Sequence, residues 1–170
     1  ATLKSRVPFV HFFDGFRTSH EIQKVEEIDA EGIKALIDQQ ALADFRRRAL
    51  NPNAPVTRGT AQNQDVYFQS REASNRFYDA VPDIVAGYMA QISQVTGREY
   101  HPFDYYGAAD AEQVIVAMGS VTHTIRQTVD YLNKQGKKTG VVLVRLYRPF
   151  SAKYLLDVLP ASVKRVTVLD

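Results

Sequence analysis

The clearest periodic signal in this chain is a stripe of apolar side chains between positions 71 and 95. These side chains recur at spacings of three and four, which places them on one face of a helix: Ala73, Phe77, Val81, Ile84, Val85, Tyr88, Met89, Ile92 and Val95. Ser70 is suited to cap the start of this helix, and Gly97 its end. Pro82 lies inside the stripe, where it removes a hydrogen bond and crowds the preceding turn. The pattern therefore predicts a long helix with a kink, or two abutting helices, at Pro82.

The C-terminal part of the chain alternates between strand-like and helix-like patterns. Short runs rich in β-branched residues at 113–118, 141–146 and 166–169 predict strands. The stripe that begins at Val121 and closes at Gly136 predicts a helix between the first two runs. A second helix, capped by Ser151 and stopped by Pro160, is expected before the third run. The order βαβαβ predicts an α/β fold with a mainly parallel sheet. We expect the aromatic residues at 100–106 to pack at a domain junction.

The first part of the chain predicts one strand and two further helices. Residues 7–13 are almost continuously apolar, which is typical of a strand buried on both faces of a parallel sheet. The six residues before them supply no neighbouring strand, so we expect the chain to be a section of a longer polypeptide. Asp29 is placed to cap a helix through Leu36, and Phe45 marks a second helix, which 51–55 ends. Residues 51–66 predict a long loop.

Composition and charge exclude several classes of protein. Hydrophobic residues make up 45% of the 170 positions and charged residues 24%, as in soluble globular proteins. The net charge of +2 is too small and too dispersed for a nucleic-acid or polybasic membrane module. No cysteine is present, so the chain offers no disulfide, thiolate nucleophile or iron–sulfur ligand. No apolar stretch approaches the ~20 residues of a membrane helix, and the lack of a signal-like segment favours the cytoplasm.

The densest polar cluster covers residues 14–21, directly after the predicted strand. Arg17 is suited to contact a carboxylate, and His20 to act as an acid, a base or a hydrogen-bond donor to a substrate. With Ser19 between them, these are the candidate residues near a substrate or cofactor. A zinc-protease helix needs a second histidine four residues after His20, and Lys24 stands there. We therefore expect no metal site, and hydrogen bonding that only stabilises a turn is an equally good interpretation.

Gly119 and Ser120 join a predicted strand to the start of a predicted helix, where free N–H groups can hold an anion. They are the candidate anion-binding residues. One glycine is weak support, because neither G-x-G-x-x-G nor a Walker lysine is present, and a simple helix cap at Ser120 or Thr122 is the favoured alternative. Arg145 and Arg148 can clamp an anion, but we favour a salt bridge between domains.

Three blocks of the sequence resemble one enzyme family. They are FFDGFRTSHE at 12–21, RGTAQN at 58–63 with YFQ at 67–69 and REA at 71–73, and VRLYRPF at 144–150 with KRVTVLD at 164–170. In this order they resemble pyruvate:ferredoxin (flavodoxin) oxidoreductases over nearly the whole chain. Members of that family use thiamine diphosphate, Mg²⁺ and iron–sulfur clusters to convert pyruvate and coenzyme A to acetyl-CoA and CO₂, with electrons passed to ferredoxin or flavodoxin.

The resemblance implies two parts in this chain. Residues 1–100 are similar to the helical tail of the pyrimidine-side thiamine domain, with a long kinked helix. Residues 101–170 resemble the α/β C-terminal domain of transketolases, truncated here. The family's pyrimidine-activating glutamate has no match, so we expect scaffold and interface without a complete catalytic site and with no cofactor bound wholly by this chain. The implied partners are the rest of the polypeptide, ferredoxin or flavodoxin, coenzyme A and a second copy in a homodimer.

Two other functions stay open at this point. One is a non-catalytic, transketolase-C-like assembly domain of another thiamine enzyme, which would leave apolar surface unpaired on the isolated chain. The other is an independent nucleotide-binding α/β domain, against which the missing glycine fingerprint argues.

Overall fold

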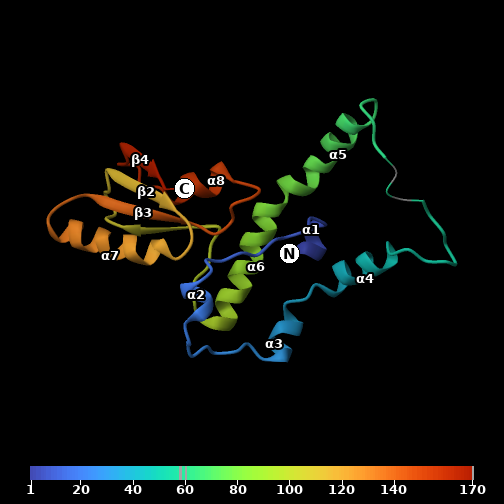
Figure 1. The fold of residues 1–170 in the computed structure, drawn as a ribbon, viewed down its shortest axis with the longest axis horizontal. Helices are drawn as coiled ribbons and strands as arrows, with labels where there is room; N and C mark the ends of the chain where they lie inside the picture. Colours follow the sequence, from blue (N-terminus) through green and yellow to red (C-terminus); the bar gives the residue numbers. More distant parts are fainter. Residues whose placement is uncertain (58, 60, 170) are drawn as a thin grey trace.

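The computed structural model describes residues 1–57, 59 and 61–169. The helices are α1 (Thr2–Ser5), α2 (Arg17–His20), α3 (Ala30–Ala35), α4 (Gln39–Arg47), α5 (Tyr67–Asp79), α6 (Val81–Thr96), α7 (Val121–Lys134) and α8 (Ala152–Val158). The strands are β1 (Phe103–Gly107), β2 (Gln113–Ala117), β3 (Thr139–Val144) and β4 (Arg165–Val168). In Figure 1, α5 and α6 run on from one another as a long rod, with α3 and α4 on one side and the sheet with α7 and α8 on the other.

Helices α5 and α6 confirm the prediction of two abutting helices. They meet at Ala80, and Pro82 occupies the first turn of α6, where a missing N–H breaks no helical hydrogen bond. Gly97 ends α6 with φ at 67°, a left-handed conformation that glycine adopts without strain. The predicted cap at Ser70 is wrong. Helix α5 begins three residues earlier, at Tyr67, and the Ser70 N–H donates to the carbonyl of Val66 inside its first turn.

The sheet has the strand order β1-β3-β2-β4 and is mainly parallel, as predicted. Strand β2 lies at its centre and pairs in parallel with β3 and with β4. Strand β1 differs from the sequence prediction, which places the aromatic residues 100–106 at a domain junction. It pairs antiparallel with β3 and places Phe103 opposite Val144. Phe103 is 1% exposed, so the strand begins with an aromatic side chain in the core.

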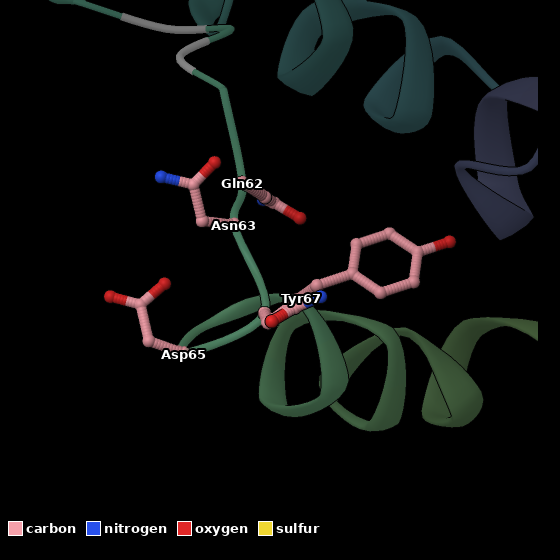
Figure 2. Close-up of a pocket in the computed structure, with 5 residues that line it drawn as sticks. Gln62, Asn63, Asp65 and Tyr67 are labelled. Atoms are coloured by element: carbon pink, nitrogen blue, oxygen red, sulfur yellow. The ribbon is translucent and has the colours of Figure 1, made fainter.

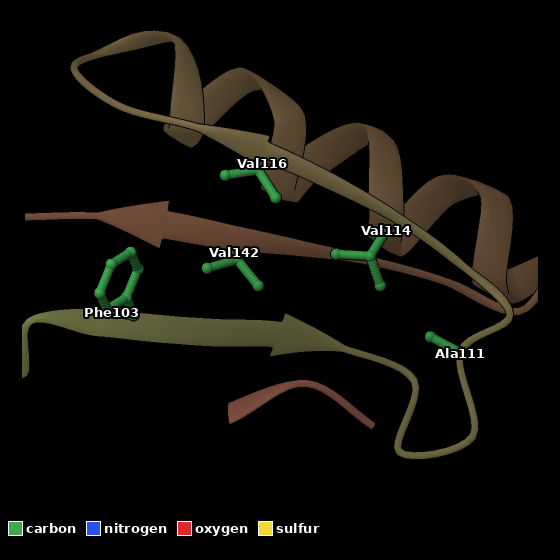
Figure 3. Packing of buried hydrophobic residues seen from close by; sticks show 5 residues of the cluster. All are labelled: Phe103, Ala111, Val114, Val116 and Val142. Carbon is green, nitrogen blue, oxygen red and sulfur yellow. The ribbon is translucent and has the colours of Figure 1, made fainter. Parts of the chain in front are cut away.

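Both faces of the sheet are covered, which explains the continuous apolar runs of its inner strands. One face buries Phe103, Ala111, Val114, Val116 and Val142 (Figure 3). Helix α8 packs against this cluster. The opposite face packs against α7 through Ala117, Ile125, Val129, Val141 and Leu143. Neighbouring residues of β2 and β3 therefore point to opposite faces, each into its own apolar cluster. We call the sheet with α7 and α8 the α/β unit.

The strand predicted at residues 7–13 is wrong. The segment forms no strand and has no neighbour to pair with. Val7 is buried, but Val10, Phe12 and Phe13 are 86%, 60% and 66% exposed. A strand buried on both faces needs partners that supply hydrogen bonds and apolar contacts. The described residues hold none beside this segment, so its apolar pattern has no sheet to enter.

Two short helices and a long loop follow, as predicted. Asp29 accepts a hydrogen bond of 2.6 Å from the Gly32 N–H at the start of α3. Asp38 caps α4 in the same way, accepting from the Ala41 N–H at 2.9 Å. The described part of 51–66 contains turns and one isolated bridge, between Asn51 and Ala54. The family-like blocks also include Arg58, Thr60 and Asp170, which lie outside the described residues.

A third apolar cluster joins the helical rod to the α/β unit. It contains Val7 from the N-terminal segment, Val81 and Val85 from α6, and Leu146 from the loop after β3. Nearby, the Tyr154 hydroxyl of α8 donates to Asp83 of α6 over 2.7 Å. We call these contacts the junction. They place the N-terminal segment between the rod and the sheet, so that residues 14–20 lie near one end of the α/β unit (Figure 1).

Candidate functional site

The three residues proposed near a substrate lie together in one exposed turn, α2. Its conformation starts at Phe16, whose φ is 49°, unusual for a residue with a side chain. The Ser19 hydroxyl donates to the Phe16 carbonyl over 3.0 Å, and His20 Nδ1 lies 2.5 Å from the same oxygen. Ser19 and His20 also contact each other at 3.0 Å. These contacts match the alternative in which the polar residues stabilise a turn.

Arg17 occupies the outer surface of this turn. Its guanidinium lies 3.9 Å from the carboxylate of Glu21, one helical turn further on, and its side chain is 86% exposed. A pair this exposed contributes little to stability and is weakened further by salt. Arg17 is therefore free to exchange Glu21 for another carboxylate without a large cost, although the described residues build no cavity around it.

The residue that the sequence reasoning missed is Asp14. Its carboxylate accepts a hydrogen bond from the backbone N–H of Ser120, a residue 106 positions away at the start of α7. Hydrogen bonds from the Ser120 side chain and backbone lower the pKa of Asp14 below its ordinary value. The two candidate sites, the turn and the helix start, are thus brought together by one side chain. The Asp-Gly pair that opens the polar cluster was the only hint in the sequence.

Gly119 makes room for this contact. Its φ is 82°, and a Cβ at this position would lie 2.9 Å from both carboxylate oxygens of Asp14. In this structure the anion at the helix start is therefore a carboxylate of the chain itself. Helix α7 has no side-chain cap of its own: the Thr122 hydroxyl donates to the Gly119 carbonyl and leaves the helix N–H groups to others. A cofactor phosphate at Gly119 and Ser120 remains a prediction, and it would compete with Asp14.

Arg145 forms a salt bridge, but within the α/β unit. Its guanidinium pairs with Asp104 of β1, and it also lies over the ring of Tyr100, 5.3 Å from the centroid. The prediction that this salt bridge links two domains is wrong, because Asp104 and Arg145 lie at the ends of the neighbouring strands β1 and β3. His101 pairs with the same aspartate at 2.7 Å, in agreement with a structural role for that histidine.

A wide, open hollow lies beside the loop that leads into α5. It is lined by Gln62, Asn63, Gln64, Asp65 and Tyr67. Figure 2 shows their side chains diverging, with Asn63 and Asp65 to one side of the loop and the ring of Tyr67 to the other. A ligand site needs polar groups that converge in a mostly apolar cavity. This hollow does not meet that requirement.

Comparison with known proteins identifies the family. A family profile described as pyruvate flavodoxin/ferredoxin oxidoreductase, thiamine diphosphate-binding, matches residues 1–90, more than half of the chain. The chain belongs to this family. A second profile, pyruvate:ferredoxin oxidoreductase core domain II, matches residues 111–170. The family resemblance of the three sequence blocks is confirmed.

Relatives match along the whole of this chain. It is 62% identical over 170 residues to the pyruvate:ferredoxin oxidoreductase of Moorella thermoacetica, which covers 100% of this chain and 14% of that protein. It is 60% identical over 168 residues to the pyruvate-flavodoxin oxidoreductase of Enterobacter agglomerans, covering 99% and 14%. The chain therefore spans about 14% of the length of these curated relatives.

Among solved structures, the 2-oxoglutarate:ferredoxin oxidoreductase of Magnetococcus marinus, with 2-oxoglutarate, coenzyme A and succinyl-CoA bound, superposes with a TM-score of 0.47. The sequence identity is 17%, over 69% of this chain and 20% of that one. A likeness of this size supports no inference about ligands.

The residues of this chain do not by themselves fit the family's metal groups. Across residues 1–57, 59 and 61–169, no three His, Cys, Asp or Glu side chains gather closely enough to hold a metal ion. Iron–sulfur clusters are ligated mainly by cysteine thiolates, and the chain has no cysteine. None of the described helices is long and apolar enough to cross a bilayer.

Proposed function

We propose that this chain is a scaffold section of an oxidoreductase that decarboxylates pyruvate oxidatively and passes the electrons to ferredoxin or flavodoxin. The products are acetyl-CoA and CO₂. The observation that carries this proposal is the identity of about 60% to pyruvate oxidoreductases along the entire chain, with no region left unmatched. Because this sequence identity extends over every helix and strand, no segment is left over for a separate function.

A scaffold role agrees with the chemistry of the described residues. The polar side chains of α2 satisfy one another, and Asp14 satisfies the start of α7. In the whole enzyme, thiamine diphosphate, Mg²⁺ and the iron–sulfur clusters would then be held mainly by residues outside this chain. Arg17, Ser19 and His20 remain our candidates for residues that approach the substrate or cofactor.

The division into parts also belongs to the proposal. We place the boundary near residue 100, between the tail of the pyrimidine-side thiamine domain and an α/β domain like the C-terminal domain of transketolases. The loop from Gly97 to Pro102 supports this position, because it separates the rod from the first strand of the sheet. Coenzyme A as a substrate, a homodimeric assembly and a cytoplasmic location complete the proposed description.

Residues outside this chain are expected to select the electron acceptor. Relatives named for ferredoxin and for flavodoxin are 62% and 60% identical to it, so the sequence does not separate the two groups. A surface that selects between a small iron–sulfur protein and a flavoprotein is expected to differ more strongly. We infer that either acceptor docks on another part of the enzyme.

The proposal is tested with the full-length polypeptide, purified without oxygen. Pyruvate, coenzyme A and an oxidised viologen dye as electron acceptor are mixed with it, and dye reduction and acetyl-CoA are measured. We expect coupled formation of both products, while the 170-residue chain alone gives neither. A full-length protein that carries its cofactors and does not reduce the dye would contradict the proposal.

A non-catalytic assembly domain of another thiamine enzyme is the second candidate. It is favoured by the large apolar side chains left exposed along the N-terminal half, among them Phe12, Phe13, Phe16, Ile22 and Phe68. Under this alternative the full-length protein would fold and assemble but would leave pyruvate unchanged in the assay above.

A further inference from the structure

We propose that Asp14 is a positioning residue, whose carboxylate at the first turn of α7 holds the α2 turn against the α/β unit. The contact between Asp14 and α7 is independent of the protein's function. Its effect on pyruvate turnover rests on the proposed function, because it acts through the candidate residues Arg17, Ser19 and His20.

The contact at the helix start is built from both sides. The first N–H groups of an α-helix have no partner within the helix and carry the positive end of its dipole, which favours a carboxylate. Asp14 takes the N–H of Ser120, and Gly119 provides the space that any larger residue would fill. The fold brings this acidic side chain to a glycine that lies 105 positions later in the sequence.

The contact reaches the candidate residues through a short stretch of backbone. Asp14 precedes Phe16 by two residues, and the Phe16 carbonyl is the oxygen on which both Ser19 and His20 converge. The ring of Phe16 also lies 5.6 Å from that of His20. Fixing the chain at Asp14 therefore fixes the acceptor that organises the turn.

Within the described part of the chain, no other polar side-chain contact links the α2 turn to the α/β unit. The side-chain hydrogen bonds and the ion pair of residues 16–20 all stay within residues 16–21. The turn is thus internally satisfied, and Asp14 supplies the polar link between it and α7. If this link is lost, we expect the turn to keep its local contacts but to move relative to the α/β unit.

The experiment uses hydrogen exchange and kinetics on the full-length enzyme. Asp14→Ala removes the carboxylate, whereas Asp14→Asn keeps an amide oxygen that can accept from the same N–H. Asp110→Ala is the matched control, since that exposed carboxylate pairs with Lys138, at 2.6 Å, elsewhere on the α/β unit. Gly119→Ala is a second route to the same defect, because its Cβ displaces the carboxylate from the other side.

We expect Asp14→Ala and Gly119→Ala to raise amide exchange both in residues 15–21 and in the first turn of α7. A displaced substrate-proximal turn should also lower kcat/KM for pyruvate about tenfold or more. Asp14→Asn should restore both properties in part, because its amide oxygen accepts the hydrogen bond without the negative charge, and Asp110→Ala should change neither.

Unchanged exchange in residues 15–21 of Asp14→Ala would overturn the proposal and leave Asp14 as a simple helix cap. Faster exchange with unchanged kcat/KM would overturn the role in turnover. If the unaltered enzyme does not turn over pyruvate, the proposed function fails, and exchange still decides whether Asp14 positions the turn.

Discussion

At the scale of single residues, the position of the α2 turn against the α/β unit depends on one exposed carboxylate, that of Asp14. Asp14 is exposed, and it accepts from a backbone N–H at the start of a helix. Ser120 and Gly119 are exposed as well. The contact therefore acts through geometry and charge rather than through burial, and it should respond to the protonation of Asp14.

The acid stability of this contact can be predicted from the sign of the pKa shift. Hydrogen bonds from Ser120 lower the pKa of Asp14 below its ordinary value of 3.8. A lowered pKa in the folded state stabilises the fold above the ordinary value, and this contribution is lost as the pH falls through the lower, folded-state pKa. The Asp14 carboxyl should thus titrate below pH 3.8 in a carbon-13 NMR titration, and the protection of the Ser120 amide, relative to its intrinsic exchange rate at each pH, should fall in the same range. A midpoint at or above the ordinary value would count against the contact.

At the scale of elements, apolar packing and not polar contact holds the rod to the α/β unit. Val81 is fully buried, and Leu146 is 5% exposed. The hydrogen bond from Tyr154 reaches an Asp83 whose side chain is 71% exposed, so it contributes at most about 1 kcal/mol. Truncating a buried leucine costs about 2–5 kcal/mol, so the apolar cluster supplies most of the stability of the junction.

Two leucines provide a matched test of this difference. Leu146→Ala should lower the free energy of unfolding by about 2–5 kcal/mol, because it leaves a cavity between α6 and the loop after β3. Leu156→Ala, on α8, removes the same atoms from a side chain that is 66% exposed and should change it by less than about 0.5 kcal/mol. Urea unfolding of both variants measures the two values. Equal losses would show that the junction is not the site of the stabilisation.

Residues 7–13 are the element whose pattern and structure disagree. The chain spans about 14% of the length of its relatives, so we expect other parts of the full-length polypeptide to cover this apolar segment. We expect the amides of residues 9–13 to exchange slowly in the full-length protein and fast in the 170-residue chain. Mass spectrometry of peptides from both proteins tests this, with β3 as the segment that stays protected in each. Equally fast exchange would show that the segment is not covered.

At the scale of the whole molecule, the chain exposes far more surface than its mass requires. Its accessible surface is 13,107 Å². A compact monomer of 19.2 kDa exposes about 8,400 Å². The excess of about 4,700 Å² is several times the roughly 800 Å² that each partner buries in a standard interface. Much of it is apolar and lies on the N-terminal half, where side chains such as Phe16 and Ile22 are at least 85% exposed.

This surface predicts that the 170-residue chain associates with itself in solution. Sedimentation velocity over a range of concentrations should show a rising average mass, because association buries exposed apolar side chains. The double variant Phe12→Asp with Phe13→Asp should shift the association to higher concentration. Tyr131→Asp, a comparable change at an exposed aromatic residue of α7, is the control. A chain that stays monomeric at all concentrations would contradict this expectation.

The sequence alone determined the features that depend on neighbours a few residues away. The α6 stripe with its proline and glycine, and the caps at Asp29 and Ser151, follow from periodicity and local hydrogen bonds. The apolar runs of β2 and β3 mark these segments as strands before their partners are known. The family resemblance likewise rests on contiguous blocks, and within the candidate site the residues of α2 share one turn.

Tertiary structure decided what depends on distant partners. It placed β1 beside β3, left residues 7–13 without a sheet, and joined Asp14 to Ser120 across 106 positions. A strand exists only when another edge supplies its hydrogen bonds, and a carboxylate caps a remote helix only when the fold brings the two together. Periodicity reports which face of a segment is apolar, whereas it does not report what that face will meet.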